Sequence, residues 1–198
     1  MAGQPWNDAR EALAGLAELY ARYDTDGLDV YFLNDPRCRV NLRVRATIGA
    51  IWASLPLRRQ TPTGTKLKEI LDKYIPLVEN KRVLHKPINI IVITDGAATD
   101  DPVETIVEAA RRLDRNEVPH RQLGIQFVQI GNDLGATEAL KELDNELEHQ
   151  YLIRDMVDTT LFDPRNPQFK AETLLKIMMG AVDQPLDRGY PFRRSASD

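Results

Sequence analysis

The sequence predicts an α/β fold whose sheet is doubly wound and mostly parallel, with helices on both faces. Over most of the chain, segments rich in β-branched residues alternate with amphipathic segments of about ten to fifteen residues. The run from Ile88 to Thr94 is almost continuously apolar, which is typical of a strand covered on both faces. Helices of this length between strands imply right-handed crossovers, and these connect parallel strands.

The N-terminal third predicts a helix, two short strands and a second helix. Apolar residues from Trp6 to Tyr23 recur at steps of three and four, which is the spacing of one helical stripe. Turn-forming residues 24–27 follow, and then Leu28 to Leu33 and Cys38 to Leu42 have the composition of strands. Helical spacing returns between Val44 and Leu55 and stops at a proline.

The rest of the chain alternates between helices and strands. It predicts helices over residues 67–78, 102–115, 135–148 and 169–182, and strands over 88–94, 123–130 and, more weakly, 151–157. We expect one Rossmann-like domain over residues 1–184 and a C-terminal tail over residues 185–198. The predicted fold opens with a helix, whereas a doubly wound sheet normally opens with a strand.

Composition indicates a cytoplasmic globular protein. The chain has 198 residues, of which 42% are hydrophobic, and a formal net charge of −4. Its single cysteine, Cys38, cannot form an internal disulfide, which fits a reducing compartment. No apolar run approaches the roughly 20 residues that span a bilayer, and the N-terminus has no signal-peptide pattern. Because Lys and Arg are scattered, we expect neither nucleic acid nor membrane as a partner.

Two loops are placed where α/β proteins bind ligands. Asp95 directly follows the most apolar strand, and the loop Thr61–Thr65 directly precedes a helix. Ligands of open α/β sheets bind beyond the carboxyl ends of the strands, so both loops are candidates. A carboxylate and several hydroxyls are hard oxygen ligands, which suit Mg²⁺ or Ca²⁺.

These loops also carry a family resemblance. The segment from Ile90 to Asp100, which contains Ile-Thr-Asp-Gly, resembles the fourth strand and following loop of a von Willebrand factor A (VWFA) domain. The segment Thr61-Pro62-Thr63-Gly64-Thr65-Lys66-Leu67 is similar to the threonine loop of that family. The resemblance covers nearly the whole chain and is closest to small, intracellular, fungal-type members. It implies a metal-ion-dependent adhesion site with Thr61 and Asp95 as metal ligands and Thr63 and Gly96 as partner-binding residues.

The third motif of that family, Asp-x-Ser-x-Ser at the end of its first strand, is absent. By the resemblance, Met1 sits where the residue after the second motif serine would be, so we expect the central first strand to be missing as well. Loss of a central strand would leave two unpaired strand edges in the core. We therefore expect this chain to bind Mg²⁺ or Mn²⁺ feebly or not at all, and a version extended upstream with the motif to bind it.

Each feature also has a purely structural interpretation. Asp95-Gly96 is a common strand-ending turn, and Thr63 or Thr65 could cap a helix. Asp100 and Asp101 are expected to cap the helix that follows them. The three histidines are far apart in the sequence and predict no zinc site, and Cys38 has no general base beside it in the sequence.

Three functions follow from these residues. The leading one is a non-enzymatic binding module that holds an acidic residue of an unknown partner protein through Mg²⁺. The second is a degenerate scaffold that binds partners without a metal, which the missing motif favours. The third is an α/β enzyme acting on a nucleotide or phosphate, although neither Gly-x-Gly-x-x-Gly nor a Gly-Lys-Ser/Thr phosphate loop occurs and no catalytic set is visible.

Overall fold

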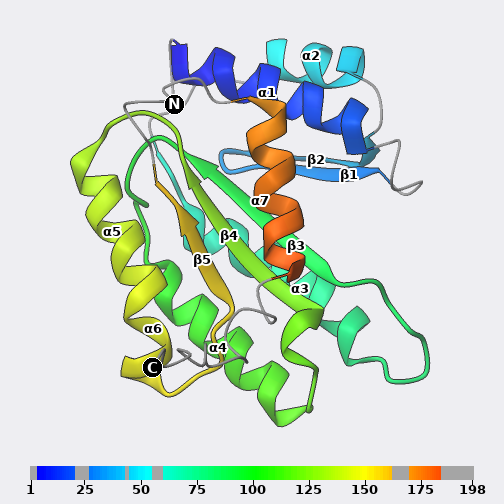
Figure 1. Cartoon of the computed structure of the whole chain (residues 1–198), viewed down its shortest axis with the longest axis vertical. Helices are drawn as coiled ribbons and strands as arrows, with labels where there is room; N and C mark the ends of the chain where they lie inside the picture. Colours follow the sequence, from blue (N-terminus) through cyan, green and yellow to red (C-terminus); the bar gives the residue numbers. More distant parts are fainter. Residues whose placement is uncertain (1–3, 21–26, 43–44, 55–59, 162–169, 184–198) are drawn as a thin grey trace, which may run out of the picture.

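The computed structural model describes residues 4–20, 27–42, 45–54, 60–161 and 170–183. Within them the chain is mixed α/β, as the sequence predicts (Figure 1). The described part holds a three-stranded parallel sheet and a separate two-stranded antiparallel sheet. The predicted tail, residues 185–198, lies outside the described residues. No helix of the described part is long and apolar enough to cross a membrane.

The parallel sheet has the strand order β3-β4-β5. Its strands are β3 (Ile88–Thr94), β4 (Leu123–Gln129) and β5 (Val157–Thr160). Ile88 pairs with Leu123 and Ile125 pairs with Val157. The crossovers run through α4 (Pro102–Arg115) and through α5 (Leu134–Asn145) with α6 (Leu147–Tyr151). The predicted strand–helix alternation is thus confirmed over this region.

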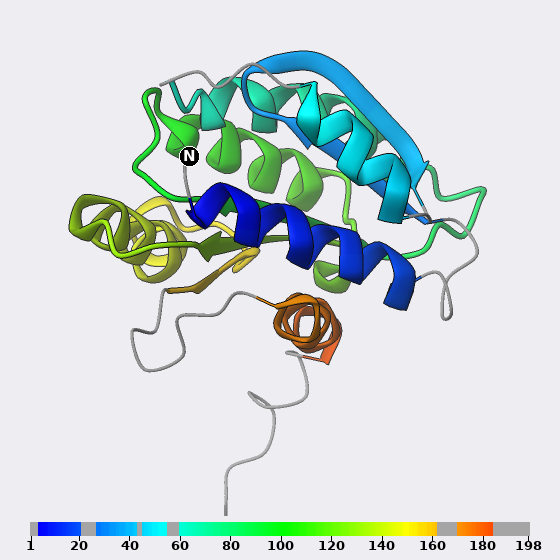
Figure 2. The same cartoon turned by 90° about the horizontal axis from the view of Figure 1, so that it is seen from above.

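Helices cover both faces of this sheet. On one face, α3 (Thr63–Glu79), α4 and α5 pack against Ile90, Ile125 and Phe127 in the largest apolar cluster. On the other face, α1 (Gln4–Tyr20) and α7 (Ala171–Asp183) contact each other, and their Leu16 and Leu174 form a smaller cluster with Val128. Figure 2 shows α7 and the pair α3 and α4 on opposite sides of the sheet.

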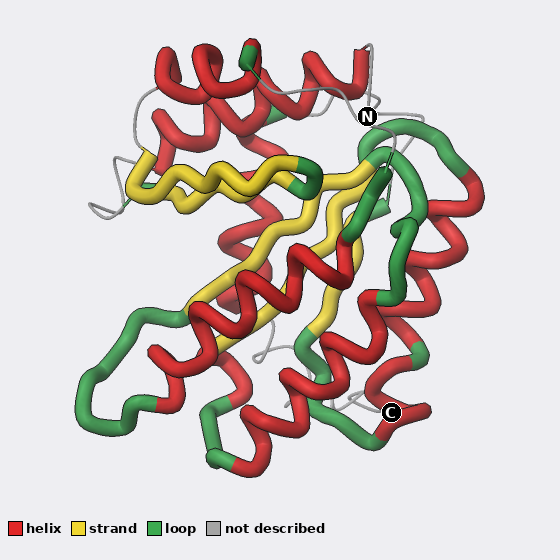
Figure 3. Tube along the Cα trace, turned by 180° about the vertical axis from the view of Figure 1, so that it is seen from behind, coloured by secondary structure: helices red, strands yellow, loops and turns green. Residues whose placement is uncertain are grey.

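The N-terminal strands form their own hairpin rather than joining the sheet. β1 (Leu28–Phe32) pairs antiparallel with β2 (Asp35–Leu42), and α2 (Arg45–Ala53) follows. Figures 1 and 3 show the hairpin running at an angle to the parallel strands. Among the described residues no ladder connects β1 to β3, so this part of the chain forms two sheets where the sequence predicted one.

The weak strand predicted over residues 151–157 is displaced. Tyr151 still belongs to α6, and Leu152 then adopts a left-handed φ of 51° that ends the helix. The strand begins only at Val157, where the backbone meets Ile125 of β4. A non-glycine left-handed residue is uncommon, and nothing in the local sequence marks Leu152 as one.

Candidate functional site

The two loops singled out by the sequence lie side by side beyond the C-terminal end of β3. Thr99, in the loop that follows Asp95 and Gly96, donates its backbone N–H to the Thr61 carbonyl at 2.9 Å. Thr61 returns a bond by donating its N–H to the Thr99 hydroxyl at 3.1 Å. Segments 38 residues apart are therefore joined at the sheet edge where the predicted metal ligands lie.

Asp100 fills the N-terminus of α3. Its carboxylate accepts hydrogen bonds from the Gly64 N–H at 2.8 Å, the Thr65 N–H at 2.7 Å and the Thr65 hydroxyl at 2.7 Å. Partial burial alone would raise the pKa of Asp100, but the bonds from Thr65 and Gly64 outweigh it and lower the pKa below the usual 3.8. Anionic oxygens are stabilised at a helix N-terminus by its unpaired N–H groups and its dipole.

This geometry corrects two capping predictions. Asp101 caps α4 as expected, accepting from the Val103 N–H at 2.8 Å, but Asp100 caps the preceding helix instead of the following one. The N-cap residue of α3 is Pro62, and it makes no side-chain cap bond. Thr65 lies within the first turn of α3 rather than at its N-cap, and its side chain donates to the Asp100 carboxylate.

Close packing holds the two loops together as well. A Cβ on Gly64 would lie 2.5 Å from the carbonyl oxygen of Asp101, a backbone atom, so only glycine fits at this approach. Thr63 beside it is 4% exposed, and its hydroxyl donates to the Thr61 carbonyl at 3.4 Å. Thr63, which the resemblance implies is a partner-binding residue, is therefore buried and hydrogen-bonded to its own loop.

The Asp95-Gly96 segment is a tight turn at the end of β3. The buried hydroxyl of Thr94 donates to the Gly96 carbonyl at 2.8 Å, and the Thr94 carbonyl accepts the Ile130 N–H at 2.8 Å. A Cβ on Gly96 would meet no atom within 4 Å, so this glycine borders open space. The turn anchors Asp95 at the sheet edge, next to the joined loops.

The hairpin also reaches this edge. Asn34, in the turn between β1 and β2, donates its side-chain amide to the Gln60 carbonyl, directly before Thr61. Gln129 and Asp133 occupy the end of the neighbouring strand, where Asp133 caps α5 through the Ala136 N–H at 2.7 Å. Polar groups from the β1–β2 turn, the loop before α3, the β3–α4 loop and the β4–α5 loop therefore gather at one end of the molecule.

The oxygen donors fit Mg²⁺ in kind but supply few ligands. Thr61 and Asp95 offer at most two, and Mg²⁺ requires six in octahedral geometry. The carboxylates of Asp100 and Asp101 are committed to helix N-termini. In the described ranges no group of three or more His, Cys, Asp or Glu side chains is arranged to hold a metal. Any Mg²⁺ here would keep most of its water.

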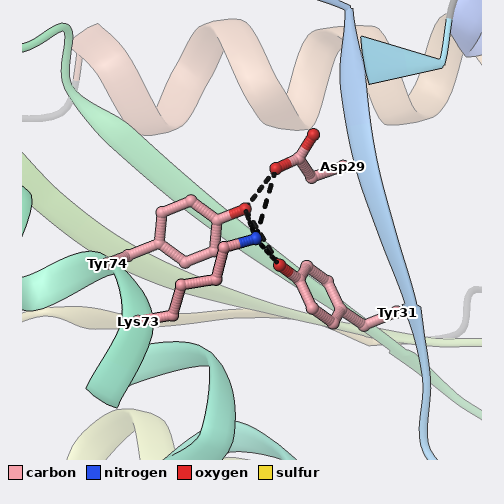
Figure 4. A network of polar contacts seen from close by, with 4 residues as sticks. All are labelled: Asp29, Tyr31, Lys73 and Tyr74. Atoms are coloured by element: carbon pink, nitrogen blue, oxygen red, sulfur yellow. Dashed lines mark hydrogen bonds and ion pairs between the residues drawn. The ribbon is translucent and has the colours of Figure 1, made fainter. Parts of the chain in front are cut away.

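A second polar cluster, which we call the Tyr–Lys clasp, consists of Asp29 and Tyr31 on β1 and Lys73 and Tyr74 on α3 (Figure 4). Lys73 donates to the Tyr31 hydroxyl and Tyr74 donates to the Asp29 carboxylate, while the two tyrosine hydroxyls lie 3.1 Å apart. The Lys73 amine also lies over both rings, 5.2 and 4.8 Å from their centres.

The pKa shifts in the Tyr–Lys clasp favour the protonated forms of Lys73 and Tyr74. The hydrogen bond to Tyr31 raises the pKa of Lys73, and burial followed by the bond to Asp29 raises the pKa of Tyr74. Lysine therefore stays protonated and Tyr74 stays neutral, so neither serves as a base or nucleophile near pH 7. The clasp fastens the hairpin to α3. Sequence reasoning missed it, because residues 42 to 45 positions apart carry no local signal of their meeting.

Comparisons with protein-family models, curated proteins and solved structures found no match for this chain.

Proposed function

We propose that this chain is a non-enzymatic protein-binding module. It uses the edge formed by Thr61, Asp95 and Gly96 to hold Mg²⁺ or Mn²⁺, and the metal in turn binds an acidic residue of a partner protein. The observation that carries the proposal is the pair of hydrogen bonds between Thr61 and Thr99, which bring the threonine loop to the loop that begins at Asp95. A metal held by few protein charges remains electrophilic enough to bind an outside carboxylate.

The VWFA resemblance belongs to the same proposal. The split into a β1–β2 hairpin and a separate β3-β4-β5 sheet is what a VWFA-like fold without its central first strand would give. In that setting Thr61 and Asp95 would be the remaining metal ligands, and Gly96 would leave space for a partner. With so few ligands we expect a dissociation constant for Mg²⁺ of about millimolar or weaker. The cytoplasm, suggested by the single cysteine, is the proposed compartment.

A metal-free scaffold is the second candidate. It is favoured by the engagement of Asp100 with Gly64 and Thr65, because the carboxylate nearest the threonine loop satisfies backbone donors instead of remaining open to a metal. The same contact weighs against a phosphate-handling enzyme. A phosphate at the start of α3 would need the N–H groups that Asp100 already occupies. Lys66, the lysine of that segment, pairs with Glu69 at 2.6 Å.

Paramagnetic broadening by Mn²⁺ tests the metal proposal. In the ¹⁵N-labelled chain, we expect the amide signals of Thr61 and Gly96 to broaden first and to recover when Mg²⁺ is added in excess. Asp95→Asn should abolish this broadening. Asp133→Asn is the matched control, since it removes a charge at the end of the next strand while Asn still caps α5. Broadening that is centred elsewhere, or that survives Asp95→Asn, would overturn the metal proposal and leave the scaffold.

A further inference from the structure

The connection between α3 and β3, residues 80–87, projects from the edge at which the parallel strands begin (Figures 1 and 3). Its backbone forms a hydrogen-bonded turn. Val83 donates its N–H to the Asn80 carbonyl at 3.2 Å, and Arg82 donates its N–H to the Asn80 side chain at 3.1 Å. The turn therefore holds Val83 and the residues beside it at the surface of the molecule.

Two contacts fasten the α3–β3 connection to the connection that leads into β4. Gln122 donates its side-chain amide to the His85 carbonyl at 2.6 Å, and Lys81 pairs with Glu117 at 3.1 Å. Asp95 follows the other end of β3, roughly 20 Å away along the strand. This surface is therefore separate from the proposed metal site.

Large apolar side chains are exposed on and beside the α3–β3 connection. They lie in the last turn of α3 or in the connections that lead into β3 and β5. In the described part of the chain five such side chains are exposed, and four belong to this edge: Leu77, Val83, Leu84 and Leu152. Leu84 is 99% exposed, so it contacts almost nothing of its own chain, and Val83 is 52% exposed. Single exposed apolar residues are ordinary, but a group of them at one edge indicates an interaction site.

The same connection is basic. Lys81, Arg82 and Lys86 are exposed, and the connection contains no aspartate or glutamate, although the whole chain has a net charge of −4. Arg121, exposed just before β4, adds another positive charge. Glu117 opposes them, but both members of its pair with Lys81 are largely exposed, so water screens the pair. A chain that is negative overall thus has a positive surface around its most exposed leucine.

We propose that this surface attaches the chain to an anionic lipid bilayer. Val83 and Leu84 enter the boundary between headgroups and acyl chains, while the lysine and arginine side chains around them bind lipid phosphate and carboxylate groups. A leucine that projects almost wholly into solvent suits a bilayer, which adapts to its shape, whereas a folded partner needs a matching pocket. Stable attachment requires two signals, and this surface supplies an apolar and a basic one. The sequence alone predicted no membrane partner, because it does not show that these residues share one surface.

Sedimentation of the full chain with lipid vesicles tests this proposal. We expect the chain to sediment with vesicles of equal parts phosphatidylserine and phosphatidylcholine, but not with vesicles of phosphatidylcholine alone. Arg82→Gln should weaken binding about fivefold, and Leu84→Ser about tenfold. The matched controls are Lys141→Gln and Leu134→Ser, which change an exposed lysine and an exposed leucine of α5 and should leave binding unchanged. Binding to neither kind of vesicle, or equal binding to both, would overturn the proposal.

A fluorescent label distinguishes insertion into the bilayer from attraction by charge alone. With Cys38→Ser in place, Leu84→Cys carries a nitrobenzoxadiazole label, whose emission we expect to rise when the mixed vesicles are added. The same label on Leu134→Cys should not respond. A label on Leu84→Cys that stays in water would refute insertion.

Polyglutamate is the probe for an acidic polypeptide as the occupant. We expect it to bind more weakly than the mixed vesicles and without dependence on Leu84. Binding as tight as that of the vesicles, and weakened equally by Leu84→Ser, would replace the bilayer with an acidic polypeptide. None of these results depends on the metal proposal.

Discussion

Removal of the Asp100 carboxylate should loosen the start of α3 more than any neighbouring polar change. In Asp100→Ala the Gly64 N–H, the Thr65 N–H and the Thr65 hydroxyl lose their acceptor. Three hydrogen bonds at about 0.5–1.5 kcal/mol each would give an upper value of about 4.5 kcal/mol. Water reaches this partly exposed position and replaces some of them, so we expect a loss of about 2 kcal/mol in the free energy of unfolding.

Urea denaturation of two neighbouring variants measures this effect. Asp101→Ala removes one capping bond, to Val103, and should cost about 1 kcal/mol. The pH dependence is the sharper test. Because the folded state lowers the pKa of Asp100, its stabilisation is present above pH 3.8 and is lost as the pH falls through the folded-state pKa. A cost for Asp100→Ala no larger than that for Asp101→Ala, or one that stays constant from about pH 6 to pH 2, would refute this assignment.

Two further perturbations test the contacts that organise the molecule. Gly64→Ala should cost about 1–3 kcal/mol in urea denaturation, because its Cβ would meet the Asp101 carbonyl; Gly49→Ala, a helical site with nothing within 4 Å, should stabilise by about 0.5–1 kcal/mol. Because folding raises the pKa values of Lys73 and Tyr74, their protonated forms stabilise the folded state. This stabilisation is fully present below the unfolded-state pKa values of 10.5 and 10.0, and it is lost as the pH rises through the folded-state pKa values. The urea midpoint should therefore fall above about pH 10 and fall less steeply in Tyr74→Phe, and a pH-independent midpoint would contradict the Tyr–Lys clasp.

The sequence predicted well the features that depend on neighbours in the chain. The apolar run of β3, the helical spacing of α4 and the cap at Asp101 are each set within a few residues, and all three are confirmed. The rule that loops gather beyond the carboxyl ends of strands also placed Thr61 next to the loop after β3. Local pattern and topology were sufficient for these.

Features that depend on distant pairing were not predictable. Asp100 lies next to a residue that caps α4. Only its hydrogen bond with Gly64, 36 residues away in the sequence, shows that it caps α3 instead. The separation of the hairpin from the parallel sheet is a matter of strand partners, which periodicity does not encode. The meeting of Tyr31 with Tyr74 is likewise a product of how β1 crosses α3.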